Sequence, residues 1–335
     1  MKKITVYIPV FLLLFTIMFT GCNQRKKQDI EKFNIVCTIF PQYDWVRQII
    51  GDKKDNFNLT LLLNNRIDLH NYQPSVDDII KISNCDLFIY IGGESDEWVD
   101  DVLEQALNPN MIVINLLDIL GDKAKHEDHH VESMHEDDDH DHHNDDAHGH
   151  DDHDGDDHLD EHVWLSLRNA IIFCPVIVNA LSSLDEVNTE TYQNNMGSYI
   201  GKLATLDFEY QTAIRTSPLN TLLFADRFPF RYLVDDYSIS YYAAFSGCSA
   251  ETEASFETII FLAKKMDELN LNSVMVTESS EQSIAKTVIS NTKKRNQKIL
   301  VLDAMQSVTS RDVDNGTTYI SIMEKNLSVL KEALK

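Results

Sequence analysis

Short apolar runs alternate along most of this chain with longer stretches whose apolar residues recur every three or four positions. Continuous apolar runs are typical of strands buried on both faces of a parallel sheet, and the periodic stretches are typical of amphipathic helices. The first half therefore predicts helices at 41–50, 75–83 and 96–107, and strands at NIVCTI (34–39), FNLTLLL (57–63), DLFIYI (86–91) and MIVINL (111–116).

The second half repeats this plan. One helical stripe consists of Phe256, Ile259, Ile260, Ala263, Met266 and Leu269, and a second consists of Ile320, Met323, Leu327 and Leu330. Strand–helix alternation that occurs twice favours an α/β fold with two parallel-sheet lobes. The strands are expected at TLLFA (221–225), ISYYAAF (239–245), SVMVT (273–277) and KILVL (298–302).

The segment between the two halves, 166–216, has no strand signal. Asn188 and Thr189 predict the start of a long helix that ends near Thr216, although Gly197 and Gly201 weaken it locally. One long helix would join the lobes stiffly. Ligands bind open parallel sheets at the carboxyl ends of the strands, so the cleft between the lobes is the expected site.

The amino terminus has the features of an export signal. Lys2 and Lys3 precede an apolar stretch that is broken by Pro9, and Phe19-Thr20-Gly21-Cys22 then resembles a bacterial lipobox. That resemblance implies cleavage before Cys22 and a lipid on its sulfur. A plain signal peptide and an uncleaved anchor are the alternatives, and no second apolar run is expected to reach membrane length.

These patterns divide the chain into consecutive parts. We predict a signal peptide at 1–21, a tether at 22–32, an N-terminal α/β lobe at 33–187 with a disordered His/Asp-rich loop at 122–160, a linking helix at 188–216 and a C-terminal α/β lobe at 217–335.

The formal net charge of −25 is concentrated in one tract, because 17 of the 54 acidic residues lie between His126 and Glu161, where no Lys or Arg occurs. Low complexity and like-charge repulsion predict disorder there. The acidic chain argues against a nucleic-acid partner and favours cations. The tract is interpreted as a weak, multivalent metal collector, with a solvated loop that binds nothing specific as the alternative.

Histidine placement separates this tract from a second candidate site. Eleven of the 13 histidines lie from His126 to His158, and only His70 and His162 lie outside that run. His70 follows an apolar strand, where a loop at the carboxyl end of a sheet is expected. His162 stands where the acidic tract gives way to a helix. Both positions suit ligands in a cleft.

Four motifs then resemble those of the zinc/manganese ABC-transporter substrate-binding lipoproteins. DLHNYQPS, from Asp68 to Ser75, is similar to the family's D-P-H-x-Y-x-P-S, and DEHVWLS, from Asp160 to Ser166, is similar to D-P-H-x-W-L-S. Gly92 to Trp98 resembles G-x-x-x-E-x-W, and Gly247 to Ser255 resembles G-x-S-P-E-x-E-P-S. The resemblance covers about Phe33 to Lys335. A His-rich insertion before the second motif is typical of the zinc-preferring branch.

The resemblance implies a buried tetrahedral metal site between the lobes, with His70 and His162 as ligands from the first lobe. Glu278, in SVMVTESSEQ, matches the family's glutamate at the end of a second-lobe strand, and Glu281 is close enough to compete. Without the resemblance, both glutamates are interpreted as carboxylates at a solvated helix N-terminus.

The chain departs from the family at the third ligand, which is usually a His in H-D-A-F-G-Y-F. The matching stretch, FADRFPFRYL, places Arg227 at that position, and a guanidinium offers a metal no lone pair. We therefore expect the neighbouring Asp226 to be the ligand. Water, Glu281 and Cys248 are the alternatives, and Asp226 paired with Arg227 or Arg231 in a structural ion pair is the non-functional interpretation.

The expected function is binding Zn²⁺ outside the cytoplasm, as a monomer anchored to the membrane by its N-terminal lipid, and delivering it to an ABC permease and its ATPase. Two imidazoles and two carboxylates also leave Mn²⁺ open. A surface metal-buffering or adhesion lipoprotein is a further alternative. The sequence has no HExxH motif and no evident general base, so we do not expect an enzyme.

Overall fold

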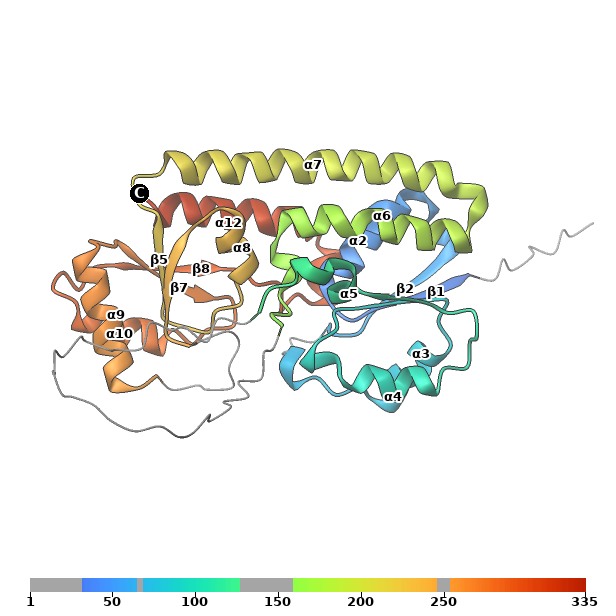
Figure 1. Ribbon diagram of the computed structural model, residues 1–335, viewed down its shortest axis with the longest axis horizontal. Helices are drawn as coiled ribbons and strands as arrows, with labels where there is room; N and C mark the ends of the chain where they lie inside the picture. Colours follow the sequence, from blue (N-terminus) through green and yellow to red (C-terminus); the bar gives the residue numbers. More distant parts are fainter. Residues whose placement is uncertain (1–31, 65–68, 127–158, 246–253) are drawn as a thin grey trace, which may run out of the picture. The chain divides into compact units, whose positions relative to one another are not determined.

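The structure, a computed structural model, describes residues 32–64, 69–126, 159–245 and 254–335. A four-stranded parallel sheet with the order β2-β1-β3-β4 forms the first lobe (Figure 1). The predicted α/β lobe is confirmed. Its strands are β1 (Phe33–Cys37), β2 (Phe57–Leu61), β3 (Leu87–Tyr90) and β4 (Ile112–Asn115).

A second four-stranded parallel sheet, with the order β6-β5-β7-β8, forms the second lobe. In each sheet the chain order reverses beside the first strand, between β1 and β3 and between β5 and β7. Crevices that bind ligands open at the carboxyl ends of strands beside such a reversal. The strands are β5 (Thr221–Phe224), β6 (Ser240–Ala243), β7 (Ser273–Thr277) and β8 (Lys298–Leu302).

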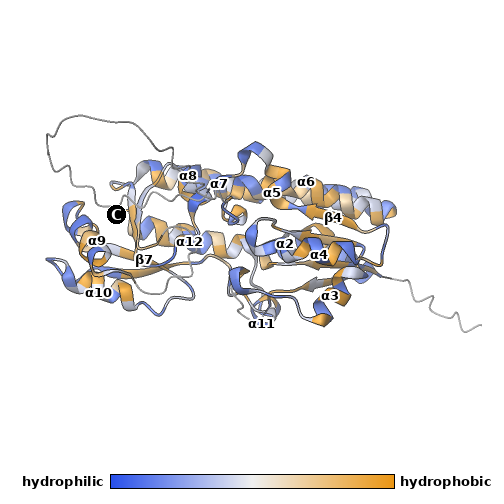
Figure 2. Cartoon of the chain, turned by 60° about the horizontal axis from the view of Figure 1, so that its bottom comes forward, coloured by the Kyte–Doolittle hydropathy of each residue, from blue (hydrophilic) through white to orange (hydrophobic). Residues whose placement is uncertain are grey.

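Helices cover both sheets, and apolar positions concentrate in the strands and on the helix faces that meet them (Figure 2). One continuous cluster of buried apolar residues extends from the first sheet to β5, so the two lobes share a core. The helices are α2 (Phe40–Ile50), α3 (Val76–Ser83), α4 (Trp98–Glu104), α5 (Leu116–Leu120), α6 (Leu167–Leu184), α7 (Thr189–Thr216), α8 (Arg231–Asp236), α9 (Phe256–Glu268), α10 (Ser283–Asn291), α11 (Ser310–Asp314) and α12 (Tyr319–Ala333).

The predicted linking helix is α7, 28 residues long, which runs along the top of Figure 1. Its buried side chains recur at helical spacing and pack on α6, α2 and α12. A Cβ atom at Gly197 or Gly201 would meet no atom within 4 Å, so these glycines are not required by close packing. The buried side chains are Tyr192, Tyr199, Leu203, Leu206, Tyr210 and Ile214.

α12 forms a second link between the lobes that the sequence did not reveal. The Tyr319 N–H donates to Asp44 of α2 at 2.8 Å, and the Tyr319 hydroxyl donates to the carbonyl of Trp164 at 2.7 Å. The rest of α12 packs beside β8 of the second lobe. The lobes are therefore joined by two helices.

α6 corrects the expectation that no second apolar run reaches membrane length. By length and composition alone this 18-residue helix could cross a membrane. Half of it is buried, however, and α7 is its main packing partner. Its apolar character is explained by its place in the core.

The apolar stripe expected on α9 is also only partly correct. Ala263 and Met266 are buried together with Leu262, but Phe256 is 70% exposed, and Ile260 and Leu269 are exposed as well. The helix buries a narrower face than the periodicity predicted, because its main contacts are with α10.

The two ends of the histidine tract have defined structure. His126 pairs with Leu159 in an antiparallel bridge, and the Asp160 N–H donates to the Lys125 carbonyl at 2.7 Å. The bounds predicted for the disordered loop, 122–160, differ from the structure at both ends, because a 3-10 turn at Gly121–Lys123 and the pairing of residues 125–126 with 159–160 give these residues defined structure. Residues 127–158 lie outside the described part of the chain.

A buried carboxylate shapes the loop that follows β3. Asp96 accepts hydrogen bonds from the N–H groups of Ile91 and Gly92, at 2.9 and 3.1 Å. Burial raises the pKa of Asp96 to about 7; the two hydrogen bonds oppose this shift and the charge of Glu161 adds to it. Between about pH 4 and pH 7 the folded protein thus holds a proton on Asp96 that the unfolded chain, with a pKa of about 3.9, releases.

Asp96→Asn should therefore stabilise the protein in a pH-dependent way. The contribution of Asp96 to stability falls as the pH rises from about 4 to about 7, and asparagine never bears the charge. We expect the variant to be more stable by about 1 kcal/mol or more at pH 8, with the gain shrinking towards pH 5. Chemical denaturation at both pH values, with the exposed Asp122→Asn as control, measures this. An equal gain at both pH values would contradict the interpretation.

Candidate metal centre

His70 and His162, far apart in sequence, lie side by side. Their ring centroids are 5.4 Å apart and the rings are tilted by 51°. His70 lies in a 3-10 turn, Leu69–Asn71, that follows β2, and His162 directly precedes another, Val163–Leu165. The structure thus brings the two first-lobe ligand candidates together.

A neighbouring carboxylate orients His162, which is fully buried. Asp160 Oδ1 lies 3.0 Å from His162 Nδ1 and also accepts the His162 backbone N–H at 2.8 Å. The Trp164 ring packs against the imidazole, with centroids 5.1 Å apart. A carboxylate at Nδ1 favours the proton on that nitrogen, which presents Nε2 to a metal.

His70 has a comparable arrangement on its Nδ1 side. Ser95 Oγ lies 2.8 Å from His70 Nδ1, and Glu161 Oε2 lies 3.6 Å from it. Burial raises the pKa of Glu161, while hydrogen bonds from Ser95 lower it. Both imidazoles therefore have a polar partner at Nδ1, an arrangement in which a metal would be bound through Nε2.

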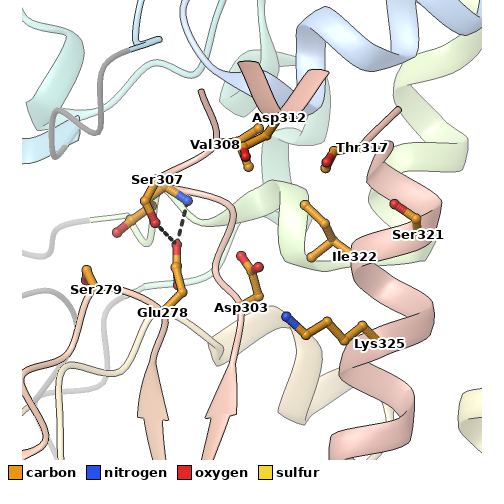
Figure 3. Close-up of a pocket in the computed structure, with 11 residues that line it drawn as sticks. Glu278, Ser279, Asp303, Ser307, Val308, Asp312, Thr317, Ser321, Ile322 and Lys325 are labelled. Carbon is orange, nitrogen blue, oxygen red and sulfur yellow. Dashed lines mark hydrogen bonds between the residues drawn. The ribbon is translucent and has the colours of Figure 1, made fainter. Parts of the chain in front are cut away.

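Glu278 follows β7 and holds the loop after β8. Its Oε2 accepts the Ala304 N–H at 2.8 Å. Its Oε1 accepts the Gln306 N–H at 2.9 Å and the Ser307 hydroxyl at 3.1 Å (Figure 3). In this structure the carboxylate thus serves as an acceptor for the loop at 303–307.

Glu278 shares a cavity of about 670 Å³ with Asp303 and Lys325. Figure 3 shows the two acids at neighbouring strand ends and Lys325 extending from α12. Burial raises the pKa of Asp303 to about 6, with the charge of Glu278 as the second cause. The charge of Glu278 therefore disfavours the ionised form of Asp303, and a cation placed beside Asp303 would oppose that effect.

Asp226 lines a different cavity, of about 400 Å³, together with Thr277 and Glu281. Its Oδ2 accepts the N–H and the hydroxyl of Thr277, each at 2.9 Å, and its Oδ1 accepts the Arg227 N–H at 2.9 Å. These bonds tie the end of β5 to the end of β7, next to Glu278 in sequence. Arg231 forms an ion pair with Asp235 at 3.3 Å.

Within the described part of the chain, no three His, Cys, Asp or Glu side chains are close enough to form a metal-binding group. The structure brings His70 and His162 together, but Glu278 and Asp226 line separate cavities. Hydrogen bonds to the loop at 303–307 and to Thr277 account for their present positions. Cys22, Cys248 and the motif at 247–255, apart from its last two residues, lie outside the described residues.

The sequence analysis did not identify the residues that lie beside Nδ1 of the two histidines, although the motifs contain them. These residues are Ser95, Asp160 and Glu161. Asp160 and Glu161 belong to the second motif and Ser95 belongs to the third. It also missed that Trp164 connects the two lobes. The indole N–H of Trp164 donates to the Ala304 carbonyl, in the loop after β8, at 2.9 Å.

Comparisons with known proteins agree with this architecture. The family model "Zinc-uptake complex component A periplasmic" matches residues 35–333. The zinc-binding lipoprotein AdcA of Streptococcus pneumoniae is 30% identical over 99% of this chain, which spans 61% of that protein's length. The high-affinity zinc uptake system protein ZnuA of Bacillus subtilis is 28% identical over 91% of this chain and 88% of its own length.

Solved structures are similar as well. The Zn(II)-bound ZnuA-like domain of S. pneumoniae AdcA has a TM-score of 0.68 and 27% identity, covering 91% of this chain and 99% of that domain. The metal-dependent lipoprotein YcdH of B. subtilis has a TM-score of 0.70 and 25% identity, covering 90% and 99%. With its paired histidines, its two parallel-sheet lobes and a family match over nearly its whole length, the chain belongs to the zinc-uptake complex component A family.

Proposed function

We propose that this protein binds Zn²⁺ outside the cytoplasm and delivers it to an ABC permease with its ATPase, while a lipid on Cys22 holds it to the membrane. The observation that carries the proposal is the pair His70 and His162, 5.4 Å apart, each with a polar group at Nδ1. Neutral imidazole is a preferred zinc ligand, and a hydrogen bond at the other ring nitrogen fixes its orientation. The names of the relatives support zinc as the metal.

The proposed ligand set is His70, His162, Glu278 and Asp226. Each carboxylate oxygen has two lone pairs, so either acid can hold a metal while keeping part of its present hydrogen bonding. Coordination by both second-lobe acids requires the loops after β5 and β7 to shift towards the histidines. Two linking helices and a shared core favour such local shifts over a wide opening of the lobes.

The protein is proposed to bind and release its cargo as a monomer, without catalysing a reaction. The histidine tract is proposed to collect ions beside the site, since its ends lie next to Asp160 and thus near His162. A weak multivalent tract raises the local metal concentration without forming the transport site.

Manganese is the second candidate cargo. Glu278, Asp303 and Asp226 supply oxygen donors, and Mn²⁺ favours carboxylate and water over imidazole. A surface metal-buffering or adhesion role would use the same chemistry without a permease.

Removing the histidine pair should abolish tight binding, whereas removing the tract should not. We expect His70→Ala and His162→Ala each to weaken zinc binding by about 100-fold or more, because each removes one of few ligands. Because His126 and Leu159 are paired, a short Gly-Ser turn can replace residues 127–158 without moving the ends. Calorimetry with Zn²⁺ and Mn²⁺ should give one tight site in that protein.

The outcomes separate the alternatives. Loss of all tight binding on replacing 127–158 would make the tract the working site. A tight site that prefers Mn²⁺ would show that the missing third histidine has changed the metal.

Second-lobe variants test the two proposed acids. Glu278→Gln and Asp226→Asn keep a hydrogen-bond acceptor but lose the charge, so we expect each to weaken zinc binding by about 10-fold or more. Glu281→Gln is the matched control, since Glu281 lines the same cavity as Asp226. Competition against a chromogenic chelator measures the dissociation constants. A larger loss in Glu281→Gln than in Asp226→Asn would assign the ligand to Glu281 instead.

A further inference from the structure

Glu161 is a buried acid at an unexpected place in the second motif. It stands between Asp160 and His162, where the family motif D-P-H has proline, and only 4% of its surface is exposed. Burying a carboxylate disfavours its charged form unless specific partners compensate. Since the family has proline at this position, the backbone geometry of the motif does not require a glutamate side chain.

The loop after β3 is shaped around this side chain. Glu161 Oε1 accepts the Ser95 N–H at 2.7 Å. A Cβ atom at Gly93 would lie 2.6 Å from Glu161 Oε1 and 2.8 Å from its Cγ, so only glycine leaves the space. Gly93 also has a φ of +82°, which other residues rarely adopt.

The second oxygen of Glu161 faces the metal centre. Oε2 lies 3.6 Å from His70 Nδ1, on the side of the ring where Ser95 Oγ also lies. It is buried, and within the described residues no hydrogen bond reaches it. The adjacent acids Asp160 and Glu161 thus each stand behind one of the two imidazoles.

We propose that Glu161 is a positioning residue for metal binding, whose carboxylate keeps the His70 proton on Nδ1, presents Nε2 to the metal and adds negative charge next to the site. This inference rests on the proposed function. Carboxylates behind metal-bound imidazoles raise ligand basicity and typically change metal affinity 10- to 100-fold.

Such a role predicts opposite effects on stability and affinity. A buried charge without full compensation lowers the stability of the metal-free protein, so its removal should not destabilise the fold. The affinity for the metal, in contrast, should be higher with that charge than without it. A carboxylate that served only the fold would have the reverse signature, with lower stability and unchanged affinity.

Glu161→Gln tests this in the full-length chain purified in detergent. Glutamine keeps an acceptor for the Ser95 N–H, loses the charge and replaces Oε2, which faces His70 Nδ1, by an NH2 group that cannot accept a hydrogen bond. Zinc affinity is measured by competition with a chelator that binds Zn²⁺ more tightly than the histidine tract does. The His70→Ala variant measures the zinc binding that remains without the proposed site. We expect a dissociation constant raised about 10-fold or more, an altered visible spectrum of the Co²⁺ form, and an unfolding temperature of the metal-free protein that is unchanged or higher.

The exposed Glu186→Gln, which changes the net charge equally, should leave all three quantities unchanged. Glu161→Asp, whose shorter side chain keeps the charge, should recover part of the affinity. Zinc affinity in Glu161→Gln within twofold of the unmodified protein would overturn the proposal while leaving the proposed function intact. If the unmodified chain binds zinc no better than His70→Ala, the proposed function fails and the role of Glu161 fails with it.

Discussion

Two consecutive hydrogen bonds connect the halves of the candidate metal centre. The indole N–H of Trp164, two residues after His162, donates to the carbonyl of Ala304, and the N–H of the same Ala304 donates to Glu278. The segments that carry His162 and Glu278 are therefore coupled through one residue of the loop after β8, Ala304, by its N–H on one side and its carbonyl on the other. Any movement of Glu278 towards a metal must also adjust the support of Trp164, and so the position of His162.

The two linking helices explain how such coupling can persist. α7 and α12 both contact the first lobe, and Tyr319 at the start of α12 donates to the carbonyl of that same Trp164. The continuous apolar core between the lobes adds to this constraint, since close-packed interiors resist gradual deformation. In the proposed function, this constraint favours short loop movements at strand ends over a wide opening of the lobes.

Sequence patterns predicted the helices and strands that depend mainly on neighbouring residues in the chain. Apolar runs located the eight strands of the described residues to within two residues at either end, and Asn188-Thr189 located the start of α7. The pairing of His70 with His162 could be inferred only from motif resemblance, because it depends on contacts across 92 residues of sequence. The positions of Glu278 and Asp226 depend on hydrogen bonds from loop N–H groups and from Thr277, which no periodicity encodes. The exposed Phe256 on α9 shows that an apolar stripe predicts a helix but does not predict how much of the stripe a neighbouring element buries.

The hydroxyl of Tyr232 in α8 accepts the Lys125 N–H and donates to the Asp160 carbonyl. One second-lobe side chain is therefore hydrogen-bonded to both ends of the histidine tract. With the ends fixed, the entropic cost of closing a loop grows only with the logarithm of its length, about 0.6 kcal/mol per doubling. Histidines can therefore be gained or lost there over evolutionary time with little effect on folding. In the collecting role proposed for the tract, the number of ions held beside the site could thus change while the candidate metal centre stays unaltered.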